Sequence, residues 1–287
     1  MGDQTSRGGH DEAAFARRAA RHAAWRTRRA VTVTADRLRR GDRTVITTPV
    51  AGLRFGNWLY LWLRAHARSA EGLPTRVLFA PGMELWLEAF PRLRQLTVQQ
   101  AAVRFHDRRE WDHAFRFQRF GVDFSGEQVD AFVRDDLAPW IDADGPGTVV
   151  VNVRRGDYYE HEGFRDMYAF DQAGYLRAAL ELSGDADRIL VVSDDALWCR
   201  ANLDGLLRRF ASSVDYAEPD PLANFRAVAA AARVIGTNST FSYWAAHVST
   251  VLHHDAQIVV PRFHARLDVG TDGYQLDPRW HAVEGFH

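Results

Sequence analysis

The most constraining feature of this sequence is the regular alternation of short β-branched runs with helical patterns that fills its second half. Alternation of this kind predicts βαβ units and a parallel, doubly wound sheet with helices on both faces. The predicted strands span residues 148–153, 188–192, 213–216, 233–236 and 257–260. The predicted helices span residues 171–182, 195–209, 220–232 and 240–249. We therefore expect the second half to fold as one α/β domain.

The first half is shorter and less regular, and we interpret it as a second α/β unit. Its expected strands and helices span residues 44–49, 58–67, 75–80, 83–90 and 126–138. The segment ADGPG at 143–147 is the strongest boundary signal, because Gly and Pro interrupt helices and strands alike. The predicted organisation is an N-terminal extension, two α/β domains and a C-terminal tail, over residues 1–43, 44–145, 146–262 and 263–287.

Composition narrows the class of function. A chain of 287 residues with 46% hydrophobic content can build sizeable cores and is expected to be a soluble globular protein. Its net charge of -1 argues against a nucleic-acid partner, because such binding needs a surplus of positive charge. The single cysteine, Cys199, excludes an intramolecular disulfide and fits a reducing cytoplasm. All 36 basic residues are arginine, which indicates a GC-rich bacterial genome such as that of an actinobacterium.

Most of the local charge asymmetry lies in residues 1–43, which are rich in arginine and partly amphipathic. This segment holds no apolar stretch long enough for a signal peptide or a membrane span. We interpret it as a frayed or packed extension. Peripheral contact of its basic helix with a membrane surface is the alternative interpretation.

Two adjacent arginines, Arg154 and Arg155, follow the strand predicted at 148–153. In an open α/β sheet, ligands bind just beyond the carboxyl ends of the strands, so both side chains are expected where a ligand sits. Their forked guanidinium groups suit a phosphate. The alternative is that they form internal ion pairs with Asp157 and neighbouring acids, and we expect this of one of the two.

Other predicted strand ends carry polar clusters as well. Ser193 and Asp194 follow the next strand, and several hydroxyls precede or open the helix at 240–249. Helix capping explains part of each cluster, but a helix start rich in hydroxyls is also a natural anion site. In the first half, the Gly56-Asn57 turn allows close approach of a backbone to a ligand. Together these clusters predict a phosphate site with no metal ligand set, and neither GxxxxGK nor GxGxxG is present.

At this point the sequence resembles a known family, the inverting α1,2-fucosyltransferases and their α1,6 relatives. VNVRRGDYY is similar to the family's HxRRxD signature, SDDALWCRANL to its SDDxxWC segment, and NSTFSYWAA to its NSTFSWWxA segment. Residues 53–62 resemble the GGLGNQLFQY opening, and residues 175–179 resemble a YYxxA helix. The order and approximate spacing hold from about residue 44 to 262, which makes the resemblance specific.

The resemblance implies a GT-B-like α/β architecture of two Rossmann-like domains with parallel sheets. The first would serve the acceptor and the second would bind the nucleotide sugar. It also implies metal-independent, inverting transfer from GDP-fucose, with no cofactor, to a glycan or small-molecule hydroxyl. Arg154 would hold the donor β-phosphate, and Arg155, paired to Asp157, would support it. The implied donor-binding residues are Gly56, Asn57, Asn152, Arg154, Arg155, Ser193, Asp194, Asp220, Asn224, Ser239, Thr240 and Ser242.

Two departures from the family pattern affect the donor base. Asn152 stands where the family has histidine, and Asn224 stands where it has an acid that helps to recognise guanine. An asparagine accepts guanine N–H groups only through its carbonyl, and Asp220, one turn earlier, is the candidate replacement. A transferase for another nucleotide sugar and a degenerate nucleotide-sugar-binding protein are the alternative functions.

The candidate general base lies shortly after the arginines. Glu162 stands eight residues after Arg154, where the α1,6 enzymes place a glutamate, and Glu160 and Asp157 are its rivals. The alternative for residues 160–162 is a solvated loop. Trp58 and Trp62 have helical spacing, which indicates core packing in preference to stacking on a substrate.

Overall fold

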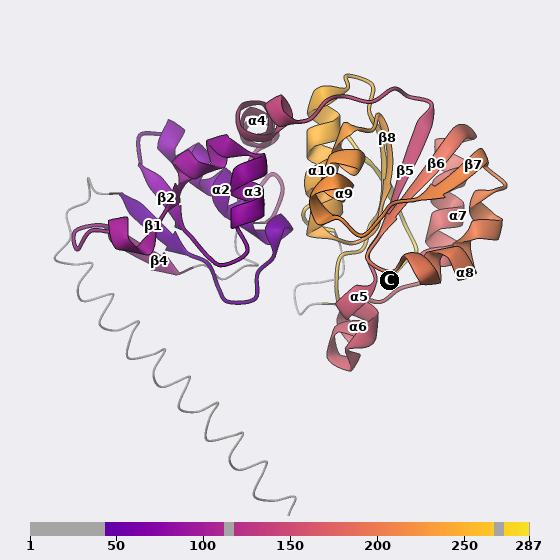
Figure 1. Ribbon diagram of the computed structural model, residues 1–287, viewed down its shortest axis with the longest axis horizontal. Helices are drawn as coiled ribbons and strands as arrows, with labels where there is room; N and C mark the ends of the chain where they lie inside the picture. Colours follow the sequence, from indigo (N-terminus) through magenta and orange to yellow (C-terminus); the bar gives the residue numbers. More distant parts are fainter. Residues whose placement is uncertain (1–43, 112–117, 267–272, 287) are drawn as a thin grey trace, which may run out of the picture.

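The computed structural model of the chain describes residues 44–111, 118–266 and 273–286 (Figure 1). The predicted extension over residues 1–43 lies outside these residues. The described part folds into two parallel sheets with helices packed against them, and this confirms the predicted α/β class and agrees with a GT-B-like pair of Rossmann-like domains. None of the described helices has the length and apolar content that crossing a membrane requires.

The first sheet has four strands, and every pairing in it is parallel. In the order β3-β2-β1-β4 they are Thr97–Val98, Thr75–Leu78, Val45–Thr48 and Arg108–Trp111. The helices of this half are α2, α3 and α4, at Phe55–Ala70, Glu84–Ala89 and Gly126–Phe132. Shorter helical segments follow at Pro91–Leu96, Gln100–Ala102, Val133–Leu137 and Ala138–Trp140. The elements expected from the sequence are present, and strands β3 and β4 are additions.

The second sheet has six strands, again all parallel. In chain order β5 to β10 are Thr148–Val153, Ala186–Ser193, Ala211–Tyr216, Arg233–Gly236, Gln257–Pro261 and His281–Val283. The helices α5 to α10 are Gly156–Glu160, Glu162–Tyr168, Gln172–Ser183, Ala196–Leu207, Pro221–Ala230 and Thr240–Leu252. The spatial order is β10-β9-β8-β5-β6-β7, so the chain moves from β5 to one edge and then returns to β8 on the other side. This creates a topological switch point between β5 and β8.

Alternate residues of β5 face two different cores. Val149, Val151 and Val153 pack with α7 and α8, whereas Val150 packs with α9 and α10. A strand buried on both faces has to be apolar at nearly every position, which explains the run that the sequence shows here. In Figure 1, α9 and α10 lie on the side of the second sheet that faces the first half.

The two halves share one continuous core through α2 and α10. The Tyr60 and Trp244 rings meet edge to face with centroids 5.0 Å apart, and Phe132 meets Trp244 at 5.5 Å. Trp58 and Trp62 are also buried in this core, as their helical spacing predicted. The amino-terminal turn of α2 is therefore held in a fixed position against the second half.

The residues expected to form a C-terminal tail contribute to both halves. Strand β10 pairs with β9, and Arg279 forms ion pairs with Asp277 and with Asp130 of α4. Beside this cluster His247 of α10 is fully buried, with its ring 4.6 Å from that of Trp280. Among the described residues, neither ring nitrogen of His247 has a hydrogen-bond partner.

Two buried histidines make the stability of the protein depend on pH. Burial lowers the pKa of both His247 and His264 from 6.5 to about 4. Between pH 6.5 and pH 4 each of these histidines is protonated in the unfolded chain but not in the folded chain. The free energy of unfolding is therefore highest above pH 6.5 and falls as the pH drops toward 4. At about 1.36 kcal/mol per pKa unit, each histidine is expected to remove about 2 to 3 kcal/mol of unfolding free energy by about pH 4.5.

Urea denaturation of the wild-type protein and of His247→Phe over this pH range checks the prediction. The variant removes one of the two titrating rings and keeps an aromatic side chain beside Trp280. Its loss of stability on acidification should be about half that of the wild type. Equal pH slopes for the two proteins would contradict the assignment.

Candidate active site

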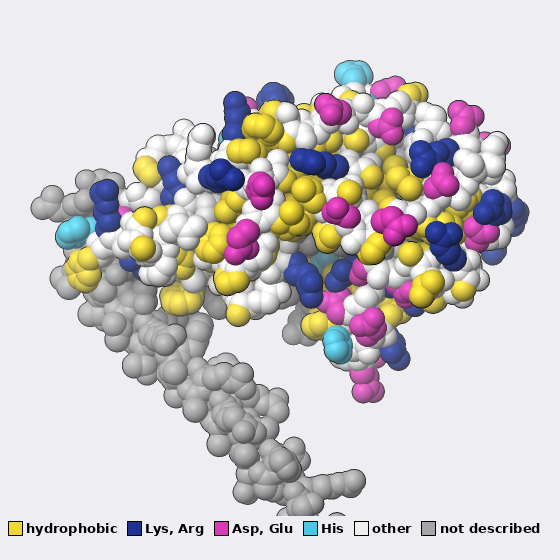
Figure 2. Space-filling model, in the orientation of Figure 1, with side chains coloured by type: hydrophobic (Ala, Val, Ile, Leu, Met, Phe, Trp, Pro, Cys, Tyr) yellow, Lys and Arg dark blue, Asp and Glu magenta, His cyan; other side chains and the backbone are white. Residues whose placement is uncertain are grey.

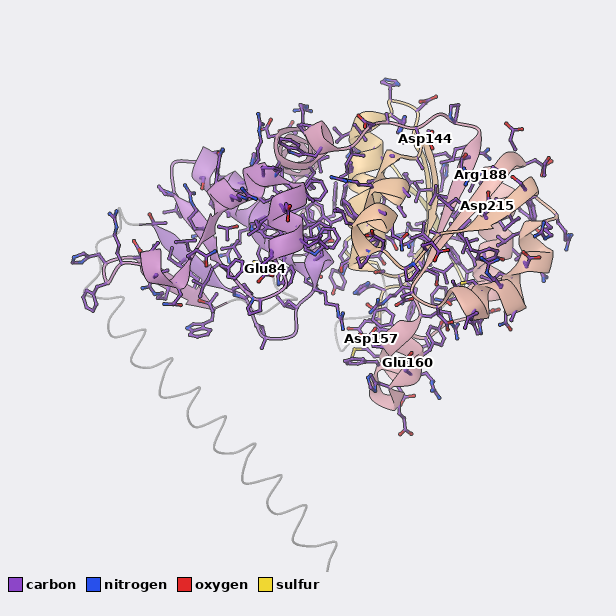
Figure 3. The ribbon with its side chains drawn as sticks, viewed as in Figure 1. Glu84, Asp144, Asp157, Glu160, Arg188 and Asp215 are labelled. Atoms are coloured by element: carbon purple, nitrogen blue, oxygen red, sulfur yellow. The ribbon has the colours of Figure 1, made fainter. Side chains whose placement is uncertain are left out.

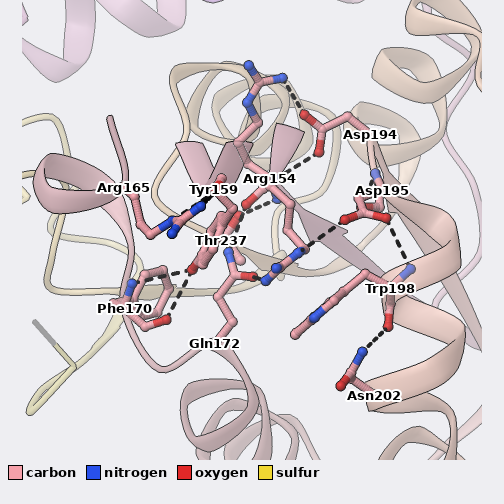
Figure 4. Close-up of polar contacts among 12 residues, drawn as sticks. Arg154, Tyr159, Arg165, Phe170, Gln172, Asp194, Asp195, Trp198, Asn202 and Thr237 are labelled. Atoms are coloured by element: carbon pink, nitrogen blue, oxygen red, sulfur yellow. Dashed lines mark hydrogen bonds and ion pairs between the residues drawn. The ribbon is translucent and has the colours of Figure 1, made fainter. Parts of the chain in front are cut away.

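The candidate site lies at the carboxyl ends of β5, β6 and β8, at the topological switch point of the second sheet (Figure 4). Arg154 and Arg155 leave the end of β5, and the short helix α5 begins directly after them. The backbone nitrogen of Arg154 donates to Thr237 Oγ1 at 2.9 Å, which ties the end of β5 to the loop after β8. The sheet therefore brings together the strand ends on which the predicted phosphate site depends.

Arg154 has a partly exposed guanidinium between two carboxylates. Its Nη1 lies 2.6 Å from Asp194 Oδ2, and its Nη2 donates to Asp157 Oδ1. Its side chain is 26% exposed. An anionic ligand that reaches this guanidinium has to compete with, or replace, one of the two carboxylates.

Arg155 is held between two aromatic rings, with its side chain 12% exposed, and acts as a structural anchor. Its guanidinium carbon lies 3.5 Å from the ring centroid of Trp198 and 3.9 Å from that of Tyr159. Its Nε pairs with Asp195 Oδ2 at 3.4 Å, and its Nη1 donates to Gln172 Oε1 at 3.1 Å. The expected pairing of Arg155 with Asp157 is therefore wrong, because Asp157 pairs with Arg154.

The two acids that follow β6 have different roles: Asp195 caps helix α8, and Asp194 pairs with Arg154. Asp195 caps α8 by accepting from Trp198 N at 3.0 Å, and Ser193 Oγ accepts from Asp195 N at 3.0 Å. Asp194 instead accepts from the backbone nitrogen of Arg155 at 2.8 Å while its other oxygen holds Arg154. Capping thus explains Asp195, Ser193 holds the backbone nitrogen of that cap residue, and Asp194 belongs to the arginine cluster.

Gly56 brings the first turns of two helices into contact. A Cβ at this position would lie 2.5 Å from Thr240 Oγ1 and 2.8 Å from Phe241 N. The sequence predicted close approach of a ligand at this glycine, whereas the structure shows close approach of another helix, at the start of α10. Ser239 caps α10 by accepting from Phe241 N at 3.3 Å. The positive ends of α2 and α10 therefore lie side by side, which favours an anion at this place.

Replacing Gly56 with alanine should destabilise the protein by about 1 to 3 kcal/mol, because backbone atoms of α10 have to move to admit the methyl group. Chemical denaturation measures the change. Gly205→Ala is the matched control, since nothing lies within 4 Å of a Cβ at this position in α8 and alanine favours a helix. An unchanged midpoint for Gly56→Ala would contradict the contact.

Asn57 is partly buried and begins a chain of side-chain amides. Its Oδ1 accepts from Gln118 Nε2 at 2.9 Å, and Gln118 Oε1 accepts from Gln275 Nε2 at 3.2 Å. This chain joins the first turn of α2 to the C-terminal segment. Asn57 is thereby held in one orientation next to Gly56.

Two residues that the resemblance implied as donor contacts lie in the interior of the second domain. Asn152 Oδ1 accepts from Ser242 Oγ at 2.6 Å, and Asn152 Nδ2 donates to the Val192 carbonyl at 3.0 Å. Both Asn152 and Ser242 are buried. Their placement indicates a role in joining β5, β6 and α10, and it does not support direct contact with a ligand.

The two candidate guanine-recognising residues lie at the start of α9, on the same edge of the sheet as Arg154. Asp220 caps this helix through one oxygen, which accepts from Leu222 N at 2.9 Å and from Ala223 N at 3.0 Å. Asn224 is half-buried in the first turn. Asp220 therefore serves at least as the N-terminal cap of α9.

The region of the candidate bases is a helical hairpin, where the alternative interpretation expected a solvated loop. Helices α5 and α6 meet at His161 and project from the carboxyl edge of the sheet (Figure 1). The rings of Tyr158 and Tyr168 stack with centroids 4.1 Å apart and fix the hairpin. Figure 3 labels Asp157 and Glu160 on α5, and Glu162 is the exposed first residue of α6.

Burial raises the pKa of Tyr158 well above its usual value, and the neighbouring Tyr168 adds to the effect. The phenol of Tyr158 therefore stays protonated beside Arg154, whose guanidinium carbon lies 5.2 Å from its ring centroid. Within the described residues, no three His, Cys, Asp or Glu side chains are grouped as a metal ion would require.

Sequence reasoning missed three residues that shape the arginine cluster: Gln172, Trp198 and Tyr159. Trp198 lies within the SDDALWC segment, so the resemblance to the family motif could have indicated that it belongs to the site. A single glutamine at a helix start gives no comparable signal. Its importance depends on contacts across the fold.

Comparison with known proteins identifies the family. The family model described as glycosyl transferase family 11 matches residues 115–259, half of the chain, including β5 to β8, the arginine cluster and the start of α10. The chain belongs to glycosyl transferase family 11. This confirms the resemblance drawn from the sequence motifs.

The curated relatives that this chain matches include proteins named galactoside alpha-(1,2)-fucosyltransferase 1. Galactoside alpha-(1,2)-fucosyltransferase 1 from Alouatta belzebul is 27% identical over 209 residues, which cover 70% of this chain and 49% of that protein. The protein of the same name from Aotus azarae is 28% identical over 208 residues, with the same coverage. That from Ateles belzebuth is 32% identical over 110 residues, or 37% of this chain. The chain spans about half the length of the first two relatives.

Proposed function

We propose that this family 11 protein is an inverting glycosyltransferase that moves fucose from GDP-fucose to a hydroxyl of a glycan or small molecule without a metal ion. The observation that carries the proposal is the partly exposed Arg154 guanidinium at the switch point of the second sheet. The names of the relatives support fucose as the sugar and a galactoside as the first acceptor to try.

The chemistry of the leaving group agrees with these residues. When the bond to the sugar breaks, the departing diphosphate gains negative charge. A fixed guanidinium and the positive ends of helices stabilise that charge. Arg154 would bind the diphosphate through its fork, with the start of α10 next to the loop that holds its backbone.

Binding of the donor requires Arg154 to exchange partners. Asp194 is also held by the backbone nitrogen of Arg155, whereas Asp157 pairs with Arg154 from the turn of helix that follows it. We therefore expect the diphosphate to replace Asp157 and to leave Asp194 in place. Arg155 would support the site without touching the donor, because its guanidinium is enclosed by Trp198 and Tyr159.

The general base of an inverting transferase has to approach the sugar from the face opposite the diphosphate. Asp157 lies against Arg154 and is therefore on the leaving-group side. Glu162 begins the next helix of the projecting hairpin and is exposed to an incoming acceptor. We propose Glu162 as the base that takes the proton from the acceptor hydroxyl, with Glu160 as its rival.

The donor base is proposed to be guanine, read at the start of α9 by Asn224 and by the carboxylate of Asp220. Asp220 Oδ1 already accepts two backbone N–H groups, which leaves the second oxygen for the base. The interior position of Asn152 favours one specific alternative, a nucleoside diphosphate sugar with another base.

A thermal-shift series tests the donor class. GDP, UDP, ADP and TDP, and the sugar forms of each, are added to the protein in EDTA. A ligand at about 100 times its Kd stabilises the folded form by about 2.7 kcal/mol, so its melting temperature rises measurably. We expect a rise with GDP and GDP-fucose only. If the melting temperature rises only with another nucleotide, the donor base has to be reassigned to that nucleotide. If it rises with none of them, the proposed donor is overturned.

A further inference from the structure

The side-chain amide of Gln172 connects the two arginines (Figure 4). Gln172 is the first residue of α7 and is only 2% exposed. Its Nε2 donates to the carbonyl oxygen of Arg154 at 2.8 Å, and its Oε1 accepts from Arg155 Nη1 at 3.1 Å. One buried amide thus contacts the backbone of one arginine and the guanidinium of the other.

The orientation of this amide is set by its two partners. A guanidinium can only donate and a carbonyl can only accept, so an amide turned the other way would meet a donor with a donor and an acceptor with an acceptor. Arg155 cannot move away, because the rings of Trp198 and Tyr159 enclose it. The Nε2 of Gln172 is therefore directed at the Arg154 carbonyl.

The backbone of Arg154 is consequently held from both sides. Its nitrogen donates to Thr237 Oγ1 at 2.9 Å, and its oxygen accepts from Gln172. These two bonds fix the direction in which the Arg154 side chain leaves the end of β5. Losing the bond to the carbonyl is costly, because Gln172 is almost fully buried and its amide N–H group would be left without a partner.

We infer that Gln172 is a positioning residue for Arg154: its amide transmits the fixed position of Arg155 to the backbone of the arginine that binds the donor diphosphate. The inference rests on the proposed function, in which Arg154 contacts the donor. It assigns to Arg155 and Gln172 together the task of aiming Arg154.

The substitution Gln172→Glu keeps the hydrogen bond from Arg155 and removes the one to the Arg154 carbonyl. The carboxylate keeps an acceptor oxygen for Arg155, but its second oxygen has no hydrogen and repels the Arg154 carbonyl. At about pH 8 we expect kcat/KM for GDP-fucose to fall by about 10- to 100-fold, the effect of a small misplacement of a binding group. The KM for the acceptor should not change.

The pH profile distinguishes positioning from a general loss of stability. As the pH falls, the introduced carboxyl becomes protonated and can donate to the Arg154 carbonyl again. The ratio of variant to wild-type kcat/KM should therefore rise toward one on acidification. A purely structural role would instead lower the ratio further, since the buried histidines already weaken the fold at low pH.

Two further proteins complete the test. Arg177→Gln changes an exposed residue of the same helix and should match the wild type. Gln172→Met removes both bonds without adding a charge, so its donor kcat/KM should be low at every pH. A donor kcat/KM of Gln172→Glu equal to that of the wild type at every pH would overturn the inference alone. A wild-type protein that neither binds GDP nor uses GDP-fucose would overturn the proposed function and the inference with it.

Discussion

Replacing Arg154 with alanine is expected to lower kcat/KM for GDP-fucose by about 1,000-fold or more, because the variant loses the charged fork that stabilises the departing diphosphate. The affinity for GDP should fall as well, since the same guanidinium contacts the diphosphate before the reaction. Initial rates of GDP release and calorimetric titration with GDP measure the two effects. Arg154→Lys keeps the charge but loses the two-pronged contact, so its activity should lie between those of the wild type and the alanine variant.

Arg188→Ala is the matched control for Arg154. Arg188 also pairs with an acid, Asp215, but this pair lies on the exposed outer part of the sheet, at β6 and β7 (Figure 3). An exposed pair contributes little to stability, so the control should keep wild-type activity and GDP affinity. Activity of Arg154→Ala equal to that of the control would contradict the assigned role.

Replacing Glu162 with glutamine is expected to lower kcat by about 100-fold or more and to leave GDP affinity unchanged. The amide cannot accept the proton of the acceptor hydroxyl, yet it keeps the size of the side chain. Asp157→Asn should behave differently, because it removes a competitor of the diphosphate for Arg154. For that variant we expect a changed KM for the donor and a smaller loss of kcat.

Glu160→Gln is the control on the same hairpin, since Glu160 is also exposed and lies two residues before Glu162. It should keep most of the wild-type kcat. If the Glu160 or Asp157 variant loses more kcat than the Glu162 variant, the base has to be reassigned to that residue.

The second sheet could be predicted closely from the sequence because its strands are buried on both faces. Strand β5 occupies the predicted residues 148–153, where an apolar run ends abruptly at two arginines. Strand β4 was missed, because Arg108–Trp111 has neither an apolar run nor alternation. It becomes a strand by pairing with β1, a contact between residues more than 60 positions apart, such as Val45 and Arg108.

Element ends in the first half depended on contacts that the sequence does not display. Helix α2 begins at Phe55, ahead of the predicted Trp58, and its cap residue Arg54 makes no side-chain capping bond. Its first turn instead packs closely against the start of α10 at Gly56. The predicted tail likewise contains β10, a short strand that only pairing with β9 identifies.

The sequence predicted which residues lie at the candidate site, but it did not predict which of them contact one another. Chain order and sheet topology place Arg154, Asp194 and the start of α10 at one edge, and this followed from the alternation of strands and helices. Which acid pairs with which arginine depends on side-chain directions, and here the sequence-based pairing of Arg155 with Asp157 failed. The interior position of Asn152 depends in the same way on the hydroxyl of Ser242.

On the face shown in Figure 2, arginines and acids are interspersed, so no large patch of a single charge is visible there. A cytoplasmic location and a bacterial source stay predictions from composition. The proposed acceptor is likewise tested by experiment, with lactose as the galactoside probe and water as the minimal acceptor.

Inverting transfer without a metal ion is tested by NMR of GDP-fucose incubated with the wild-type protein and lactose in EDTA. We expect GDP to be released and the transferred fucose to have the anomeric configuration opposite to that of the donor, with neither product formed by Arg154→Ala. Intact GDP-fucose after prolonged incubation with the wild-type protein, or transferred fucose with its donor configuration retained, would contradict it.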